Sequence, residues 1–397
     1  MRPTRLIMLV FFLQPLAFGS WLPRIPDIQQ RLGLGPADLA LALLGLPVGI
    51  LLTLPIAGPL VARIGGRSAI FYGFLGYLAV VSLPGFSNHI GVLFGALLLI
   101  GIAMSSLELG LNITADEIEK ASGKAIMSTC HGCWSLGMTV GSLLGVGLAA
   151  LGLAPQWSIM LVAVLVLPVA VLVIRALPVG PAPEPVAAGG KTGSLFVPGL
   201  LLLGICVFAF GSTLVEGAAA DWSAVYLKQA FSADSAAAGI GYSAFAATTA
   251  AGRFAGDWMK TKWGPVAVAR ACVLAALIGV TLIVLSPAYP MSLIGFALAG
   301  FGVSVGFPLA VTAAAGVGGR PAAANVAMLS IVALLGFLLG PPLIGFIAQH
   351  SSLRVGLVVL LPGLVASFVL AATLRPRRPA IAAEPQGLTA LPIGNGK

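Results

Sequence analysis

Twelve runs of about twenty mostly apolar residues follow one another along the chain. A helix of that length crosses a bilayer, because each residue adds about 1.5 Å and the hydrocarbon layer is roughly 30 Å thick. Only 8% of the residues are charged, whereas soluble domains carry about 25%. The chain is therefore predicted to be an all-α polytopic membrane protein. The expected spans are 6–23, 37–62, 68–86, 90–113, 126–150, 156–175, 197–219, 236–257, 265–286, 290–315, 322–348 and 353–374.

The positions of the Lys and Arg residues predict the orientation of these spans. If the N-terminus is cytoplasmic, all of them except Arg24, Arg31, Lys228 and Arg354 fall on the cytoplasmic side. Positive charge is concentrated on the cytoplasmic side of membrane proteins. We therefore expect an even number of spans in the lipid bilayer, with the N- and C-termini both cytoplasmic.

A segment rich in Pro and Gly interrupts the apolar pattern at 176–196 and is predicted to be a cytoplasmic linker. It separates an N-terminal six-span half, 1–175, from a C-terminal six-span half, 197–375. The remaining tail, 376–397, is predicted to be a disordered cytoplasmic segment. Two six-span halves joined in this way are typical of secondary transporters, whose substrate site lies between the halves.

Other function classes find little support in the sequence. The net charge of +9 comes from residues at helix ends without a continuous basic stripe, so no nucleic-acid partner is expected. Cys130-His131-Gly132-Cys133 resembles a metal or thiol motif, but no second Cys/His pair completes four ligands. Neither a phosphate-binding loop nor a nucleophile–base set is evident. We expect no metal, no cofactor and no enzymatic activity.

Glu108 and His131 are ionisable residues inside apolar runs. Ionisable side chains are costly in a membrane and are usually functional there. Both lie about equally far from a loop expected at 114–125, so we predict that they are level with each other and form a proton site on the cytoplasmic side of the midplane. The alternative interpretation is a polar pair that holds two helices together.

Further polar residues are candidates for a substrate cavity. Ser105 and Asn112 share a helix face with Glu108, and Ser128 and Ser135 share one with His131. Gln14 and Trp21 share a face of the first span and are further candidates, although an interfacial aromatic anchor is the favoured interpretation of Trp21. Asn325 is a weaker candidate.

Glu216 is expected on the outer side of the membrane, at a different depth from Glu108. It is a candidate for proton relay or for binding a cationic or hydroxylated solute. The alternative is a carboxylate at the rim of an outer vestibule.

Small residues and prolines predict how the spans pack and bend. Gly141 and Gly145 form a Gly-x-x-x-Gly pair that allows close helix contact. Pro47 and Pro308 lie inside spans and are expected to bend them, as are Pro55 and Pro341.

The stretch from Gly58 to Arg67, Gly-Pro-Leu-Val-Ala-Arg-Ile-Gly-Gly-Arg, resembles the signature between the second and third helices of the major facilitator superfamily. A counterpart, Gly-Arg-Phe-Ala-Gly-Asp, occupies 252–257 in the second half. The resemblance implies two pseudo-symmetric six-helix bundles that work by alternating access. It also implies gating roles for Arg63, Arg67, Arg253 and Asp257, with a cytoplasmic latch resting on Asp257 because the first copy has Ala62 at the acidic position.

The same resemblance places the outer ends of the first and seventh helices near each other. Arg24 and Asp221 end those predicted spans. We therefore expect them to form an extracellular gate, with two unpaired residues as the alternative.

A narrower resemblance is to the rhizopine-linked, MosC-like branch. It rests on Gly-Ser-Trp-Leu-Pro-Arg-Ile-Pro at 19–26, Asp-Trp-Ser-Ala-Val-Tyr-Leu at 221–227 and Gly-Pro-Pro-Leu-Ile-Gly at 340–345. More distantly the chain is similar to proton-coupled fucose permeases. Their fourth helix carries a carboxylate that Glu108 would match, whereas Gln14 stands in a first span without an acid. The resemblance implies a monomer in the bacterial inner membrane.

The expected function is secondary transport of a small polar solute, coupled to protons. The resemblance implies that the solute is sugar-like or inositol-like. One alternative is a drug or metabolite exporter of the same fold. Another, from a different class, is a membrane sensor or scaffold that transports nothing.

Overall fold

The computed structural model describes residues 2–124, 126–178, 199–318 and 322–375, and these residues form helices and short connections. The first half contains α1 (Pro3–Trp21), η1 (Leu22–Arg24), α2 (Ile25–Leu32), α3 (Pro36–Leu43), α4 (Gly45–Ile64), α5 (Gly66–Val80), η2 (Leu83–Phe86), α6 (Ile90–Ser122), α7 (Met127–Ala150) and α8 (Pro155–Arg175). The second half contains α9 (Leu200–Phe231), α10 (Ser235–Trp263), α11 (Pro265–Leu285), α12 (Tyr289–Val303), α13 (Gly306–Ala315), α14 (Ala322–His350), α15 (Leu353–Val358), α16 (Leu360–Leu370) and η3 (Ala371–Leu374).

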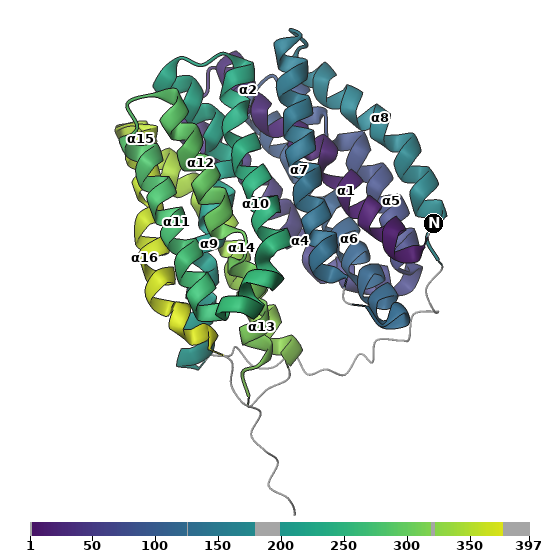
Figure 1. Ribbon diagram of the computed structural model, residues 1–397. Helices are drawn as coiled ribbons and strands as arrows, with labels where there is room; N and C mark the ends of the chain where they lie inside the picture. The colour runs from purple at the N-terminus through teal and green to yellow at the C-terminus, as the bar shows by residue number, and fades with distance from the viewer. Residues whose placement is uncertain (1, 125, 179–198, 319–321, 376–397) are drawn as a thin grey trace, which may run out of the picture.

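The two halves form two helical bundles that stand side by side (Figure 1). Helices α7 and α10 pack against each other along the seam. We call the end that carries α2 the α2 end, and the opposite end, where α8 finishes and α9 begins, the linker end. The predicted all-α membrane fold with two six-helix bundles is confirmed. The predicted tail, 376–397, and all of the predicted linker beyond residue 178 lie outside the described residues.

Eleven helical segments of the described chain are long and apolar enough to cross a membrane. Helix α10 has 29 residues, enough for a twelfth span, but it is more polar than the others. Polar and charged side chains are tolerated in a spanning helix where they face the interior of the protein or a cavity rather than lipid. The seam position of α10 accounts for its composition.

Two helices run further than the sequence pattern predicts. Helix α6 continues to Ser122, so only residues 123–126 remain for a loop. Glu119 makes this short connection possible, because its carboxylate accepts hydrogen bonds from the backbone N–H groups of Ile126 (2.6 Å) and Met127 (2.9 Å) at the start of α7. Helix α9 continues to Phe231, twelve residues beyond the predicted end of its span.

Prolines locate three interruptions in the spanning helices. A proline cannot donate to the carbonyl four residues earlier and its ring clashes with that carbonyl. Helix α3 ends at Leu43, four residues before Pro47, and α15 ends at Val358, four residues before Pro362. The break between α12 and α13 includes Ser304, four residues before Pro308. The bends predicted at Pro47 and Pro308 are therefore helix interruptions, whereas α4 and α14 continue through Pro55 and Pro341.

Glycines bring α7 into close contact with α1. A Cβ added at Gly137 or Gly141 would overlap the backbone carbonyl oxygen of Phe12 or Leu16. At Gly145 it would lie 2.5 Å from the carbonyl oxygen of Ser20. These obstacles are backbone atoms, which a rotamer change cannot move. The close packing predicted for the Gly-x-x-x-Gly pair is confirmed.

A valine at Gly141 should therefore destabilise the first bundle. We expect Gly141→Val to cost about 2 kcal/mol or more, since overpacking a tight contact displaces backbone. The same substitution at Gly147, where an added Cβ meets nothing within 4 Å, provides the control on the same helix. Thermal unfolding of both variants in detergent checks the difference, and equal losses would contradict the packing explanation.

Candidate functional site

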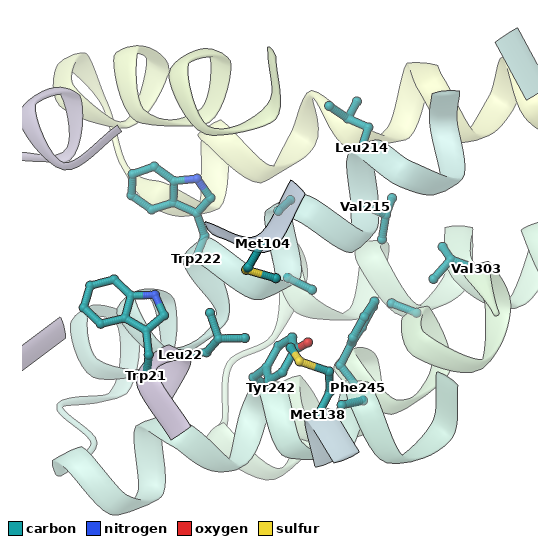
Figure 2. Packing of buried hydrophobic residues seen from close by; sticks show 14 of the residues in the cluster. Trp21, Leu22, Met104, Met138, Leu214, Val215, Trp222, Tyr242, Phe245 and Val303 are labelled. Atoms are coloured by element: carbon teal, nitrogen blue, oxygen red, sulfur yellow. The ribbon is translucent and has the colours of Figure 1, made fainter. Parts of the chain in front are cut away.

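A cavity of about 420 Å³ lies between the two bundles. Helices α1, α3, α4, α6 and α7 line it from the first half, and α9, α10, α13 and α14 line it from the second. Its wall is mostly apolar, with several aromatic rings and a few polar groups, which is the usual composition of a small-molecule site. Tyr242 and Phe245 of α10 and Met138 of α7 belong both to this wall and to the buried core (Figure 2).

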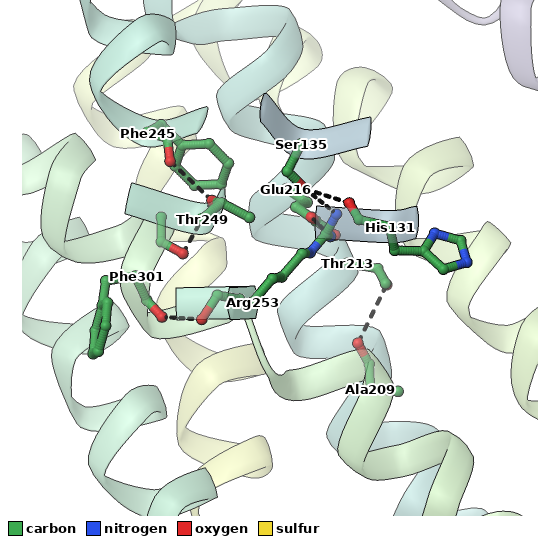
Figure 3. Close-up of polar contacts among 11 residues, drawn as sticks. His131, Ser135, Ala209, Thr213, Glu216, Phe245, Thr249, Arg253 and Phe301 are labelled. Atoms are coloured by element: carbon green, nitrogen blue, oxygen red, sulfur yellow. Dashed lines mark hydrogen bonds and ion pairs between the residues drawn. The ribbon is translucent and has the colours of Figure 1, made fainter. Parts of the chain in front are cut away.

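An ion pair crosses the cavity wall between α9 and α10. Arg253 donates to a carboxylate oxygen of Glu216 at 2.5 Å, and its other terminal nitrogen donates to the hydroxyl of Ser135 at 2.6 Å (Figure 3). The side chains of Arg253 and Glu216 are only 15% and 19% exposed. Because Ser135 lies on α7, a single guanidinium joins the two bundles and also neutralises Glu216.

Glu216 lies near the middle of α9, sixteen residues after Leu200 and fifteen before Phe231. The expectation that it lies on the outer side of the membrane, at a different depth from Glu108, is wrong, because α9 extends well past the predicted end of the span. The alternative, a carboxylate at the rim of an outer vestibule, does not fit this mid-helix position either. Glu108 lies near the middle of α6 in the same way. Both carboxylates line one cavity, from opposite halves.

The predicted level pairing of Glu108 with His131 is also wrong. Glu108 is fourteen residues before the end of α6, roughly 20 Å along the axis, whereas His131 is four residues into α7, roughly 6 Å. The error came from placing a loop at 114–125, most of which is helix. His131 still lines the cavity, with its ring edge-on to Phe11 at 5.5 Å between ring centroids. Figure 3 shows this ring pointing away from Arg253.

The carboxylates of Glu108 and Asp221 have neither an ion-pair nor a hydrogen-bond partner within the described part of the chain. Both line the cavity, one from α6 and the other from α9. Asn112 also lines it, but its amide donates to the backbone carbonyl of Glu108 at 2.8 Å. The cavity therefore contains two acidic groups that no described residue neutralises.

Gln14 is a fully buried amide in the wall of the cavity. Its carbonyl oxygen accepts a hydrogen bond from the indole N–H of Trp134 at 2.7 Å. Its amide nitrogen has no partner among the residues that the structure describes. A buried donor without an acceptor is costly, so this nitrogen is available to an oxygen or nitrogen acceptor in the cavity.

Four of the predicted substrate residues do not line the cavity. Ser105 is buried in α6, and Ser128 is exposed near the start of α7. The amide of Asn325 donates to the carbonyl of Val317 at 2.9 Å. Trp21 is 2% exposed in the core near Leu22, so the interfacial-anchor interpretation is wrong as well (Figure 2). The chain continues through η1 and α2 beyond Trp21, which buries its ring.

At the α2 end, Asp27 connects the two halves. Its carboxylate pairs with Lys228 of α9 at 3.1 Å and accepts a hydrogen bond from Ser235 of α10. Arg24 lies 2.9 Å from the same carboxylate and donates to the carbonyl of Leu153 at 2.7 Å. The structure therefore does not bring Arg24 and Asp221 together.

The two signature segments are not joined at the linker end. Arg67 donates to the carbonyl of Arg175 at 2.5 Å, within the first half, and Arg63 and Asp257 are exposed. None of the three forms an ion pair with another described residue. Because α10 continues to Trp263, Arg253 of the second copy lies well inside the helix and not at its end. There it lines the cavity.

Several important residues were missed from the sequence. Trp134 and Tyr242 looked like ordinary hydrophobic positions of their spans. Asp27 and Lys228 fall between predicted spans, in the outer loops that follow 6–23 and 197–219. Arg24 and Asp27 are three residues apart, a spacing at which side chains on a helix can pair. This contact could therefore have been predicted from the sequence.

Comparison with known proteins decides the family. A model of the Major Facilitator Superfamily matches residues 7–220 and 201–393. The chain belongs to this superfamily. An uncharacterized MFS-type transporter of Yersinia pestis is 36% identical over 370 residues, covering 92% of this chain and 94% of that protein. The membrane protein MosC of Rhizobium meliloti is 27% identical over 354 residues, covering 88% and 85%. The predicted resemblance to this branch is confirmed.

Solved structures agree on the fold. The nucleoside transporter NupG, in a D323A mutant, aligns with a TM-score of 0.75 at 15% identity, covering 94% of this chain and 100% of NupG. The MFS transporter FucP, in an outward conformation, aligns with a TM-score of 0.63 at 17% identity, covering 95% and 99%. Family and fold together make this MFS protein a secondary transporter.

Proposed function

We propose that this MFS protein moves a small polar solute across the bacterial inner membrane by alternating access, coupled to protons, with its linker end and both termini in the cytoplasm. One observation carries the proposal. Glu108 lies mid-helix and lines the cavity between the halves, and its carboxylate has no partner among the described residues. A chain that contains both halves of the cavity can act as a monomer.

Glu108 is suited to exchanging protons. A carboxylate in a mostly apolar site is costly when charged, and binding a proton removes that cost. Alternating access would expose the cavity first to one side of the membrane and then to the other. Glu108 would take up a proton on one side and release it on the other.

The ion pair of Arg253 and Glu216 is suited to linking binding to movement. Arg253 holds Ser135 of the opposite half only while its geometry is maintained. A solute or proton that competes for Glu216 would weaken both contacts. Loss of the contact with Ser135 would then free α10 to move relative to α7.

The solute class rests on the lining and on the resemblance to the rhizopine-linked branch. Gln14, Ser135 and Thr249 offer polar groups beside aromatic rings such as Trp134 and Tyr242. Rings of this kind stack on the apolar faces of cyclic solutes while polar groups bind their substituents. A sugar-like or inositol-like molecule satisfies both requirements.

Asp27 is the proposed gate residue at the α2 end. In this structure the α2 end is closed by the contacts of Asp27 with Lys228 and Ser235. Close packing of Gly239 on Pro23 also closes it. Asp27→Asn should weaken a charge-assisted network of two or three bonds, each worth about 1.5–3 kcal/mol. We expect the equilibrium to shift about tenfold or more towards a state open at the α2 end.

Thiol labelling measures this shift. Ser243 is buried in α10, where its hydroxyl lies 2.7 Å from that of Ser142 across the seam. A Ser243→Cys reporter should react faster with an external, membrane-impermeant thiol reagent when Asp27 is replaced. Asp38→Asn removes an exposed carboxylate at the same end and should leave the rate unchanged. Equal labelling rates in the Asp27→Asn and parent backgrounds would show that Asp27 is not a gate residue.

Solute counterflow tests transport itself. Purified protein is reconstituted into liposomes loaded with candidate sugars, inositols or nucleosides, and entry of the labelled solute is followed. Transient accumulation that depends on the internal solute is the expected result. A sensor or scaffold would bind a solute and show no such flux.

A further inference from the structure

The charges of the cavity are unbalanced. Its acidic residues are Glu108, Glu216 and Asp221, and Arg253 is the lining residue with a permanent positive charge. Arg253 is already paired with Glu216 at 2.5 Å. His131 also lines the cavity, but its ring faces Phe11 and points away from the ion pair (Figure 3). Two carboxylates therefore lack a partner in the described part of the chain and are available to a bound ligand.

Asp221 lies five residues after Glu216 on α9, one and a half turns nearer the α2 end, roughly 7 Å along the axis. At that end Arg24 and Lys228 are both held by Asp27. Arg31 donates to the backbone carbonyls of Gly85 and Ser87, and Arg354 to that of Val284. A carboxylate left uncompensated in an apolar wall is costly. A positive group entering the cavity would remove that cost.

The wall beside the acids also suits a cation. Phe18, Trp134, Tyr242, Phe245 and Phe337 line the same cavity. Aromatic faces attract ammonium groups, and the attraction is strongest where the contact is desolvated. The unpartnered amide nitrogen of fully buried Gln14 independently indicates a ligand with a hydrogen-bond acceptor.

We propose that Asp221 is the counter-ion for a cationic nitrogen of the transported solute, which also carries an acceptor for Gln14. The solute class is thus a small organic amine with hydroxyl or carbonyl groups. This inference rests on the proposed transport function, in which Glu108 serves the proton. If Glu108 binds the proton and Asp221 binds the solute, the charge of each carboxylate can be neutralised independently of the other.

Binding to purified full-length protein in detergent tests the inference without requiring transport. The probes are two series matched in size and differing in charge: glucosamine, glucose and glucuronate; and tryptamine, tryptophol and indole-3-acetate. Affinities come from the concentration dependence of thermal stabilisation. We expect the cationic member of at least one series to bind at least tenfold more tightly than its neutral and anionic counterparts.

Variants identify the residue responsible. Asp221→Asn should reduce the cation preference to about onefold, whereas Glu108→Gln should retain it, as should the control Asp38→Asn. Equal affinity across each series, or no binding of either amine, would overturn the inference. So would a cation preference that survives in Asp221→Asn. If a neutral solute shows counterflow and no cation preference is found, the transport proposal stands and this inference is wrong. If the protein binds amines selectively but shows no flux, the binding role of Asp221 stands and the transport proposal is wrong.

Discussion

Arg253→Gln should abolish solute counterflow and lower thermal stability together. The substitution leaves the carboxylate of Glu216 in a site where it is only 19% exposed, without its partner. Breaking a buried pair from one side costs about 3–5 kcal/mol, because an uncompensated charge remains. It also removes the bond to Ser135 that joins the halves. Counterflow should fall by about a hundredfold.

A double variant separates stability from transport. Arg253→Gln with Glu216→Gln removes both charges, and such replacements are often nearly neutral in stability. We expect its unfolding temperature to return most of the way to that of the parent while counterflow stays low. Arg253→Lys keeps the charge but cannot hold Glu216 and Ser135 in one planar fork, and should restore only a minor part of the activity. Counterflow close to the parent's in the double variant would show that the pair has only a structural role.

Glu108→Gln should uncouple transport from the proton gradient. Glutamine keeps the size and polarity of the side chain but cannot exchange a proton. We expect accumulation driven by an imposed pH gradient to fall at least tenfold, while counterflow, which needs no net proton movement, continues within about threefold of the parent. Parallel uptake and counterflow assays on one reconstituted preparation measure the two quantities.

The control lies on the same helix. Glu117→Gln makes the identical change nine residues further along α6, outside the cavity. It should leave both assays unchanged. If Glu108→Gln accumulates solute under a pH gradient as well as the parent does, Glu108 is not the proton site.

The sequence was sufficient for the fold because its strongest signals are local. Spans of about twenty apolar residues can only be helices in a bilayer, since every backbone polar group must be satisfied within the segment. Gly141 then predicted a close contact that the structure contains, and Pro47 marks a helix interruption where a bend was predicted. The helix ends were less predictable, because α6 and α9 continue as helices beyond their apolar runs.

The site depended on contacts between distant parts of the chain. The sequence identified Glu108, Glu216 and Gln14 as polar residues in apolar runs, and all three line the cavity. It could not show that Arg253, expected at a gate, pairs with Glu216, because that contact depends on how α9 and α10 are placed. For the same reason Asp27, and not Asp221, proved to be the acid that joins the halves at the α2 end.

Uptake into proteoliposomes with an imposed pH gradient tests the central claim most directly. A solute identified by counterflow is offered to vesicles with and without the gradient, and with a protonophore added. The account predicts accumulation above the external concentration that requires the gradient and collapses with the protonophore. Accumulation unaffected by the gradient would contradict proton coupling, and solute binding without flux in either direction would contradict transport.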